Sequence, residues 1–298
     1  MAFEGFELSQ VKLDDPAGEV SLRVRRGGSG PPLLLLHGHP ETHMMWGKIA
    51  GELAKDFTVV AADLRGYGKS TKPPSAKDNE TSSKRAMARD AVGLMKHFGF
   101  ERFDVAGHDR GGRVAYRLAL DHPAAVKRVS VLDIIPTGEV WARIDHRFAL
   151  GYWHWSFLAQ PYPVPEHMID ADREFYLFTA QFRGRKPNFI APDAHADYLA
   201  CGSTSEVIHG MCECYRAGSG YDRELDWADK KAGRKIERPL QVLWGAKGAV
   251  GLWYDPLAVW REWADDVRGE AIDCGHFLPE EKPAETLAAL RGFFMEGR

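Results

Sequence analysis

Short apolar runs, each bounded by glycine, proline or aspartate, alternate with helical segments through the first 136 residues. The segments SSKRAMARDAVGLMKHFG and GGRVAYRLALDHP are predicted to be helices. The predicted strands are EVSLRVRRGG, PPLLLLHG, FTVVAADL, RFDVAGHD and VKRVSVLDIIP. Strands that alternate with helices favour parallel pairing, so the pattern predicts an α/β fold with a mostly parallel central sheet.

The alternation stops near Pro136, and the chain changes character from about Gly138 to Arg234. This stretch is rich in aromatic residues and lacks a clean apolar strand, which indicates helices and turns. Strand signals return in RPLQVLWGAKG and GEAIDCGHFLPEEKP, and a final helix is predicted from Ala284. We therefore predict a helical cap (lid) at residues 138–235, inserted between two parts of an α/β core at residues 1–137 and 236–298.

The composition is that of a globular protein with a substantial core, because 44% of the 298 residues are hydrophobic and 27% are charged. The net charge is −3 and the chain has no lysine- or arginine-rich run, so it lacks the positively charged segment that binding to nucleic acid or an anionic membrane would require. No apolar run reaches the roughly 20 residues that span a bilayer, and the first residues lack a secretory signal pattern. We therefore expect a cytoplasmic protein that binds neither nucleic acid nor a membrane. Free thiols without a metal site are expected for Cys201, Cys212, Cys214 and Cys274.

The stretch FDVAGHDRGGRVAY combines a strand, a tight glycine turn and the start of a helix, with Asp109 between Gly107 and Gly111. α/β-Hydrolases place a nucleophilic serine at the equivalent turn, where the side chain is lifted above the edge of the sheet. The N-terminus of the following helix favours an ionised carboxylate. Asp109 is therefore predicted to be a nucleophile, and the alternative is an aspartate that only caps the helix.

A histidine and a second acid are needed to complete hydrolysis after attack by a carboxylate. His276 follows the last predicted strand, which gives the chain order of nucleophile first and base last. The loop after the penultimate strand, where the acid is usual, holds Gly248 instead. Asp133, one strand earlier, is the predicted acid, and Asp255 is a weaker alternative.

Over nearly its full length, the sequence resembles the fluoroacetate (haloacetate) dehalogenase family of the α/β-hydrolase superfamily. The motifs that carry the resemblance are LLLLHGHPETHMMW, ADLRGYGKS, KRAMA, AGHDRGGR, LDIIPT, YWHWSFLAQPYPVPE, YRAG and GHFLPEE. The resemblance implies that Asp109 displaces the halide and forms an ester with glycolate. Water activated by His276, which Asp133 orients, would then cleave that ester. It also implies a homodimer that requires no metal or organic cofactor.

The resemblance further assigns residues to the two ends of the substrate. Arg110 and Arg113 would bind its carboxylate, since a planar guanidinium can donate two parallel hydrogen bonds. The backbone N–H groups of His39 and Arg110 would form the oxyanion hole. The halide pocket implied by the family is His154, Trp155 and Tyr215, which offer an imidazole, an indole and a phenol donor.

Two positions depart from the family pattern. Where His39 stands in HGHP, phenylalanine is common in the family, so a polar ring lies beside the nucleophile. A tryptophan is expected to face the substrate in the middle of the cap, but FYLFTAQFRGRKPNF contains none. Phe178, Phe182 or Phe189 is predicted to occupy that space. The preference between fluoride and chloride stays open on these grounds.

Two other functions are compatible with parts of this pattern. An epoxide hydrolase could use the same Asp-His-Asp triad with cap tyrosines as proton donors, and the candidates are Tyr152, Tyr215 and Tyr221. The paired arginines argue against it, because an epoxide brings no carboxylate. A non-catalytic receptor with this fold is disfavoured by the intact set of Asp109, His276 and Asp133.

Overall fold

The computed structural model describes residues 2–182, 184 and 187–297, and these form a three-layer α/β structure with an eight-stranded sheet at its centre. The strand order is β1-β2-β4-β3-β5-β6-β7-β8. The strands are β1 Glu7–Leu13, β2 Val20–Gly27, β3 Pro32–Leu36, β4 Thr58–Ala62, β5 Phe103–His108, β6 Val126–Leu132, β7 Leu240–Gly245 and β8 Val267–Ile272. Strands β3 to β8 pair in parallel, which confirms the predicted mostly parallel sheet.

The first two strands differ from the predicted parallel pairing. Strand β1, which the apolar pattern did not reveal, pairs antiparallel with β2, and β2 pairs antiparallel with β4. A parallel partner requires a crossover of about a dozen residues, and the connection from β1 to β2 is too short to provide one. β2 is followed directly by β3, which runs in the opposite direction, and β4 is parallel to β3, so β4 is antiparallel to β2. β1 is an edge strand with mostly exposed or half-buried side chains, so it lacks the apolar run of an inner strand.

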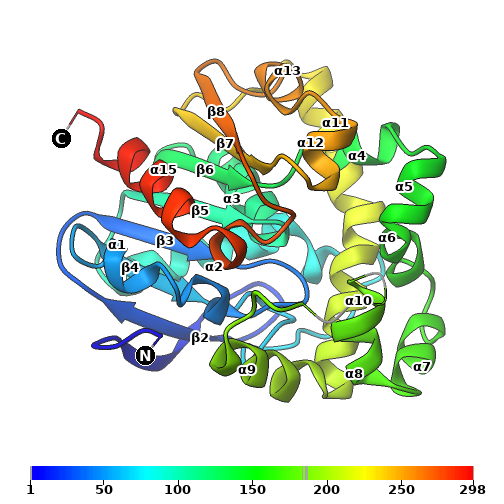
Figure 1. Cartoon of the computed structure of the whole chain (residues 1–298). Helices are drawn as coiled ribbons and strands as arrows, with labels where there is room; N and C mark the ends of the chain where they lie inside the picture. Colours follow the sequence, from blue (N-terminus) through cyan, green and yellow to red (C-terminus); the bar gives the residue numbers. More distant parts are fainter. Residues whose placement is uncertain (1, 183, 185–186, 298) are drawn as a thin grey trace.

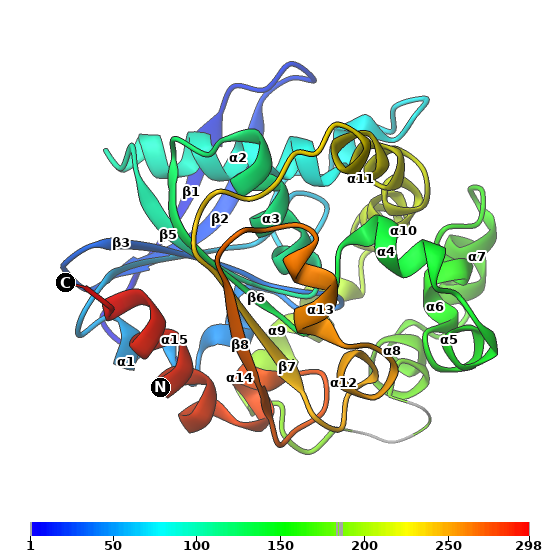
Figure 2. The same ribbon diagram turned by 90° about the horizontal axis from the view of Figure 1, so that it is seen from above.

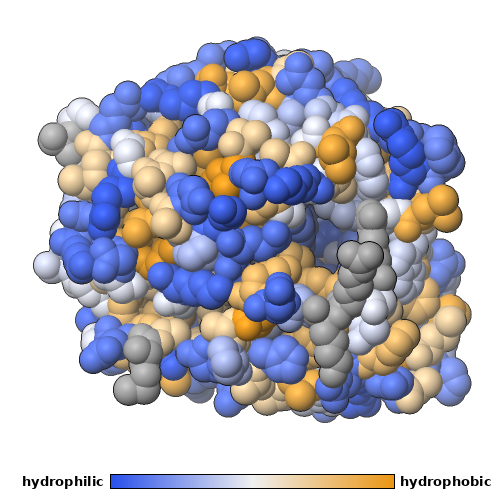
Figure 3. All heavy atoms as spheres, viewed as in Figure 1, coloured by the Kyte–Doolittle hydropathy of each residue, from blue (hydrophilic) through white to orange (hydrophobic). Residues whose placement is uncertain are grey.

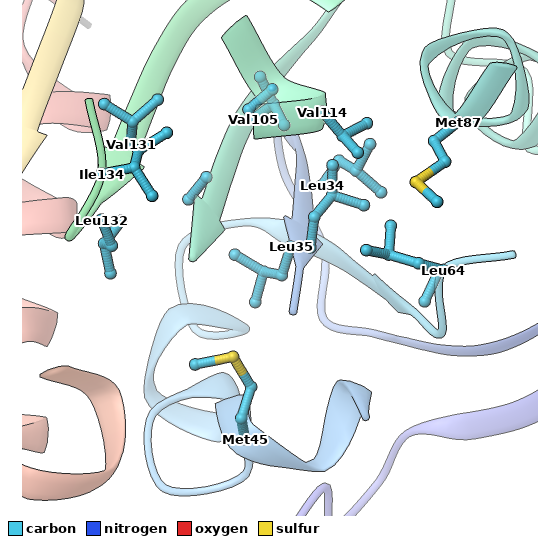
Figure 4. Close-up of a cluster of buried hydrophobic side chains, with 14 of the residues drawn as sticks. Leu34, Leu35, Met45, Leu64, Met87, Val105, Val114, Val131, Leu132 and Ile134 are labelled. Atoms are coloured by element: carbon cyan, nitrogen blue, oxygen red, sulfur yellow. The ribbon is translucent and has the colours of Figure 1, made fainter. Parts of the chain in front are cut away.

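Helices cover both faces of the sheet. Figure 2 shows α1 (Ala50–Leu53) and α15 (Pro283–Met295) on one face, with α2 (Lys84–His97) and α3 (Arg110–Asp121) on the other. The central strands are buried on both sides, and the close-up in Figure 4 shows Leu34 and Leu35 of β3 beside Val105 of β5. These three side chains have no exposed surface, which explains the nearly continuous apolar runs in the sequence.

The segment between β6 and β7 forms helices and turns in its described residues, and Figure 1 shows these helices packed beside the sheet rather than within it. They are α4 Thr137–Ala142, α5 His146–Gly151, α6 Trp153–Leu158, α7 Val164–Asp170, α8 Arg173–Phe175, the π-helix Tyr176–Ala180, α9 Pro192–Gly202, α10 Ser205–Ser219 and α11 Tyr221–Lys231. The chain after β7 adds three short helices, α12 Ala249–Trp253, α13 Pro256–Arg261 and α14 Leu278–Glu281. A helical cap in this segment is consistent with the arrangement, while its limits at residues 138 and 235 stay a prediction.

Buried ion pairs join the cap segment to the core. Arg23 of β2 donates to Asp63 and, through both terminal nitrogens, to Asp197 of α9 at 2.7 and 2.8 Å. On the other side, Arg117 of α3 contacts Asp226 of α11 at 2.8 Å. Removing one partner of a buried pair leaves an uncompensated charge, so these contacts hold α9 against β2 and α11 against α3.

Candidate active site

Asp109 stands at a sharp turn between β5 and α3, at the carboxyl end of the sheet. Its backbone has φ 42 and ψ −110, a positive φ that non-glycine residues rarely adopt. The glycines of the turn allow close backbone approach: a Cβ on Gly107 would lie 2.2 Å from the Gly111 oxygen, and one on Gly111 would lie 2.3 Å from the Leu36 oxygen. The Asp109 side chain makes no capping hydrogen bond to α3, so it is not used as a helix cap.

The Asp109 carboxylate is buried but surrounded by positive charge and donors. Its Oδ2 accepts a hydrogen bond from the His39 backbone N–H at 3.0 Å, and Arg113 Nε lies 4.0 Å from Oδ1. Burial alone would raise the pKa of Asp109, but the charges of Arg110, His276 and Arg113 hold that pKa well below its usual range. The carboxylate is therefore ionised at neutral pH, and its Oδ1 faces the positive charge of Arg113.

His276 and Asp133 lie in direct contact beside this nucleophile. His276 Nδ1 is 2.5 Å from Asp133 Oδ2, and the Gly245 N–H donates to Asp133 Oδ1 at 2.9 Å. Asp255, the weaker alternative acid, instead caps α13 by accepting the Ala258 N–H at 3.0 Å. The contact fixes the imidazole orientation and leaves Nε2 of His276 as the nitrogen that can move a proton.

A second histidine, His108, contacts the backbone of His276, and no sequence pattern indicated this role. His108 Nε2 lies 2.8 Å from the His276 carbonyl oxygen, and His108 Nδ1 lies 3.0 Å from Glu41 Oε2. Burial lowers the pKa of His108, but the adjacent Glu41 carboxylate outweighs burial and raises it to about 9. His108 is therefore protonated at neutral pH, so both ring nitrogens donate hydrogen bonds.

The two predicted carboxylate-binding arginines are both buried next to Asp109. The three guanidinium nitrogens of Arg110 have no hydrogen-bond partner among the described residues, and its guanidinium lies 3.5 Å from the Tyr215 ring centre. Arg113 donates to the Ile135 oxygen at 3.0 Å, and its Nε, 4.0 Å from Asp109 Oδ1, has no hydrogen-bond partner among the described residues. Buried guanidinium groups with unused donors are suited to an anionic ligand.

The predicted halide-binding side chains come from α6 and α10 of the cap and meet above Asp109. The ring centres of His154 and Tyr215 are 5.8 Å apart, and those of Trp155 and Tyr215 are 6.0 Å apart. Burial, with Arg110 nearby, lowers the pKa of His154 to about 3, and burial raises the pKa of Tyr215 above its usual value. Both side chains are therefore neutral hydrogen-bond donors at neutral pH.

A cavity of about 600 Å³ contains these groups and opens between the core and the cap. The exposed side chains of Leu150 and Leu252 line its mouth, and Figure 3 shows this face of the molecule hollowed where the core meets the cap. The residues that line its inner part include Asp109, Arg113, Asp133, His276, His39, His154, Trp155 and Tyr215. Arg110 is the one predicted site residue that does not line the cavity, because its guanidinium packs on the Tyr215 ring, 3.5 Å from the ring centre.

Of the three phenylalanines predicted to take the place of a cap tryptophan, Phe182 lines the cavity, and its neighbour Gln181 does so too. Phe189 packs on Phe277, with ring centres 5.4 Å apart, and Phe178 packs on His195 at 4.4 Å, away from the cavity. Gln181 was not predicted, because a glutamine in a helical segment carries no signal of its own. Of the tyrosines considered for an epoxide hydrolase, Tyr152 and Tyr215 line the cavity, whereas Tyr221 begins α11.

The described residues contain no cluster of three or more histidine, cysteine, aspartate or glutamate side chains arranged to hold a metal ion. Among the same residues, no helix combines the length and apolar character that a bilayer span requires.

Comparison with known proteins finds relatives among the alpha/beta hydrolases. The family model for the alpha/beta hydrolase fold matches residues 31–283. A fluoroacetate dehalogenase from Burkholderia sp is 42% identical over 99% of this chain and 96% of its own length. A soluble epoxide hydrolase from Corynebacterium sp is 36% identical over 90% of this chain and 91% of its own. A crystal structure from Nostoc sp, provisionally assigned as an alpha/beta hydrolase, is 48% identical with a TM-score of 0.94 over 99% of each chain.

Proposed function

The chain belongs to the fluoroacetate dehalogenase family of the alpha/beta hydrolases, and from this premise we propose that it hydrolyses haloacetates to glycolate and halide. The observation that carries this proposal is the pair of buried arginines with unused donors beside the ionised Asp109. A haloacetate supplies a second carboxylate, which can accept hydrogen bonds from these unused donors, together with a carbon that the Asp109 carboxylate can attack.

In the first step Asp109 Oδ1 attacks the carbon that bears the halogen. The carbon–halogen bond breaks with its electron pair, and halide leaves toward His154, Trp155 and Tyr215 while an ester forms on Asp109. The substrate carboxylate, held by Arg110 and Arg113, fixes the direction of attack. Neutral donors replace the water that would solvate the departing halide, so they stabilise the charge as it develops.

In the second step a water molecule attacks the acyl carbon of the ester, and His276 takes a proton from that water. Asp109 Oδ2 is then the ester carbonyl oxygen, and it already receives the His39 N–H at 3.0 Å. That N–H, with the Arg110 N–H at the start of α3, stabilises the oxyanion. Glycolate leaves with the proton from His276, and the second proton of the water is released to solvent, so the Asp109 carboxylate is restored with one oxygen atom from water.

An epoxide hydrolase is the second candidate, favoured by the 36% identical relative and by Tyr152 and Tyr215 in the cavity. An assay distinguishes the two functions by measuring halide release from fluoroacetate and chloroacetate and diol formation from an epoxide as the control substrate. The proposal requires halide release and no diol. Diol formation without halide release would establish the alternative and overturn the proposal.

Arg113→Lys is expected to lower the catalytic efficiency toward chloroacetate by about 1–3 kcal/mol of transition-state stabilisation. Lysine keeps the charge but loses the planar fork, so substrate orientation is impaired. Chloroacetamide, which has no charge, should be a poor substrate of the wild type. Steady-state kinetics on both substrates measure these effects, with Arg85→Lys as a control, because Arg85 pairs with Asp121 away from the cavity. Equal wild-type efficiency on chloroacetate and chloroacetamide would rule out carboxylate binding by these arginines.

We also propose a cytoplasmic location and a homodimer. Cys201, Cys212, Cys214 and Cys274 are buried free thiols, which suits a reducing compartment. The homodimer rests on the family resemblance, and light scattering of the purified protein measures it directly.

A further inference from the structure

The His39 imidazole is a buried polar group in the cavity wall that the two catalytic steps leave unused. Its backbone N–H contacts Asp109, but its ring is a separate feature and is 5% exposed. Both ring nitrogens are buried without a hydrogen-bond partner among the described residues. Burial, reinforced by the neighbouring His154, holds the pKa of His39 well below its usual value, so the ring is neutral with one N–H donor and one acceptor.

The ring lies beside two of the side chains proposed to bind the halide, His154 and Tyr215. Its plane is within 11° of that of His154, with ring centres 6.2 Å apart. It also meets Tyr215 edge to face, with ring centres 5.2 Å apart and planes at 80°. His154 meets Tyr215 in the same manner at 78°, so the two imidazoles flank the phenol ring in similar orientations.

An unpaired polar group in such a site is unfavourable unless a ligand pairs with it. Leaving a buried donor or acceptor unsatisfied destabilises the protein, whereas a phenylalanine would fill similar space without any polar atom. The hydrogen-bonding capacity of His39 is therefore best accounted for by a group that arrives with the substrate. Because the ring contacts His154 and Tyr215, that group is at the halogen end.

We propose that the His39 ring N–H binds the halogen of the substrate as a donor additional to His154, Trp155 and Tyr215, and that it shifts selectivity toward fluoroacetate. This inference rests on the proposed haloacetate hydrolysis. Fluoride has the highest charge density of the halides and depends most on directed donors as it leaves, whereas chloride leaves readily with weaker help. An extra donor therefore favours the carbon–fluorine bond over the carbon–chlorine bond.

The test compares His39→Phe, which removes the ring nitrogens, with His39→Gln, which keeps an N–H donor. Fluoride and chloride release from fluoroacetate and chloroacetate give a fluoride-to-chloride ratio of kcat/KM for each protein. His39→Phe is expected to lower this ratio about tenfold, which is the effect expected from the loss of one hydrogen bond in the transition state. His39→Gln is expected to stay within about threefold of the wild type, and thermal unfolding verifies that both variants are folded.

A matched comparison uses His154→Phe and the double variant with His39→Phe. If both histidines serve the same halide, their effects on the ratio should not be additive. A ratio unchanged by His39→Phe, or lowered equally by both His39 substitutions, would overturn the role of the ring while leaving haloacetate hydrolysis intact. A wild type that releases no halide from either substrate would overturn the proposed function and this inference together.

Discussion

His276→Ala is expected to release one equivalent of halide from chloroacetate and then stop, with the ester retained on Asp109. The displacement step needs no base, because Asp109 is already ionised beside Arg110 and Arg113. Hydrolysis does need one, since water must lose a proton as it attacks the ester. The steady-state rate should therefore fall by at least about 10³-fold while the halide burst persists.

Intact-protein mass spectrometry measures this outcome as an added carboxymethyl group, and peptide mapping locates it on Asp109. His97→Ala is the matched control, because His97 is exposed at the end of α2 and its ring contacts Phe98. That variant should turn over normally without an adduct. Wild-type turnover by His276→Ala, or a stalled enzyme without an adduct, would contradict the assignment of His276 as the base.

Asp109→Asn is expected to abolish halide release, with a loss of at least about 10⁴-fold, because a neutral amide is a far weaker nucleophile than a carboxylate. The substitution is a clean test of chemistry rather than folding. Asparagine tolerates positive φ better than most residues, so the turn at φ 42 should be kept. Arg110 and Arg113 remain, so the variant should still bind chloroacetate.

Halide release and calorimetric binding measure these two expectations separately. Asp265→Asn serves as the control, since Asp265 pairs with Lys235 at the surface. The intact mass must show that the introduced asparagine has not deamidated to aspartate, which would restore the nucleophile. An Asp109→Asn variant that keeps more than roughly 1% of the wild-type rate would show that another group makes the bond to carbon.

The strand pattern of the sequence predicts which part of the sheet carries the candidate site residues. Asp109 and Asp133 lie at or near the carboxyl ends of predicted strands and His276 follows one, and the carboxyl ends of parallel strands meet at one edge of a sheet. Gly248 in the usual acid position directed the prediction to Asp133, which lies 2.5 Å from His276 Nδ1. Strand β1 was missed because an edge strand needs no continuous apolar run.

The sequence could not predict contacts that depend on how the loops and the cap pack. Glu41 and His108 are 67 residues apart and meet beneath His276, although neither belongs to a recognisable spacing. In the cap, the sequence offered three phenylalanines for one position, and the side chains that line the cavity there are Phe182 and Gln181. Tertiary packing, rather than a local sequence pattern, determines that Glu41 meets His108 and that Phe182 and Gln181 line the cavity.

A single turnover in water labelled with oxygen-18 tests the central claim most directly. With enzyme in excess over chloroacetate, attack by Asp109 gives glycolate whose new hydroxyl oxygen comes from the unlabelled carboxylate. Water then attacks the ester, so the peptide that contains Asp109 should gain one labelled oxygen. Direct attack by water on the substrate would instead give labelled glycolate and an unlabelled Asp109, and that result would contradict the proposed mechanism.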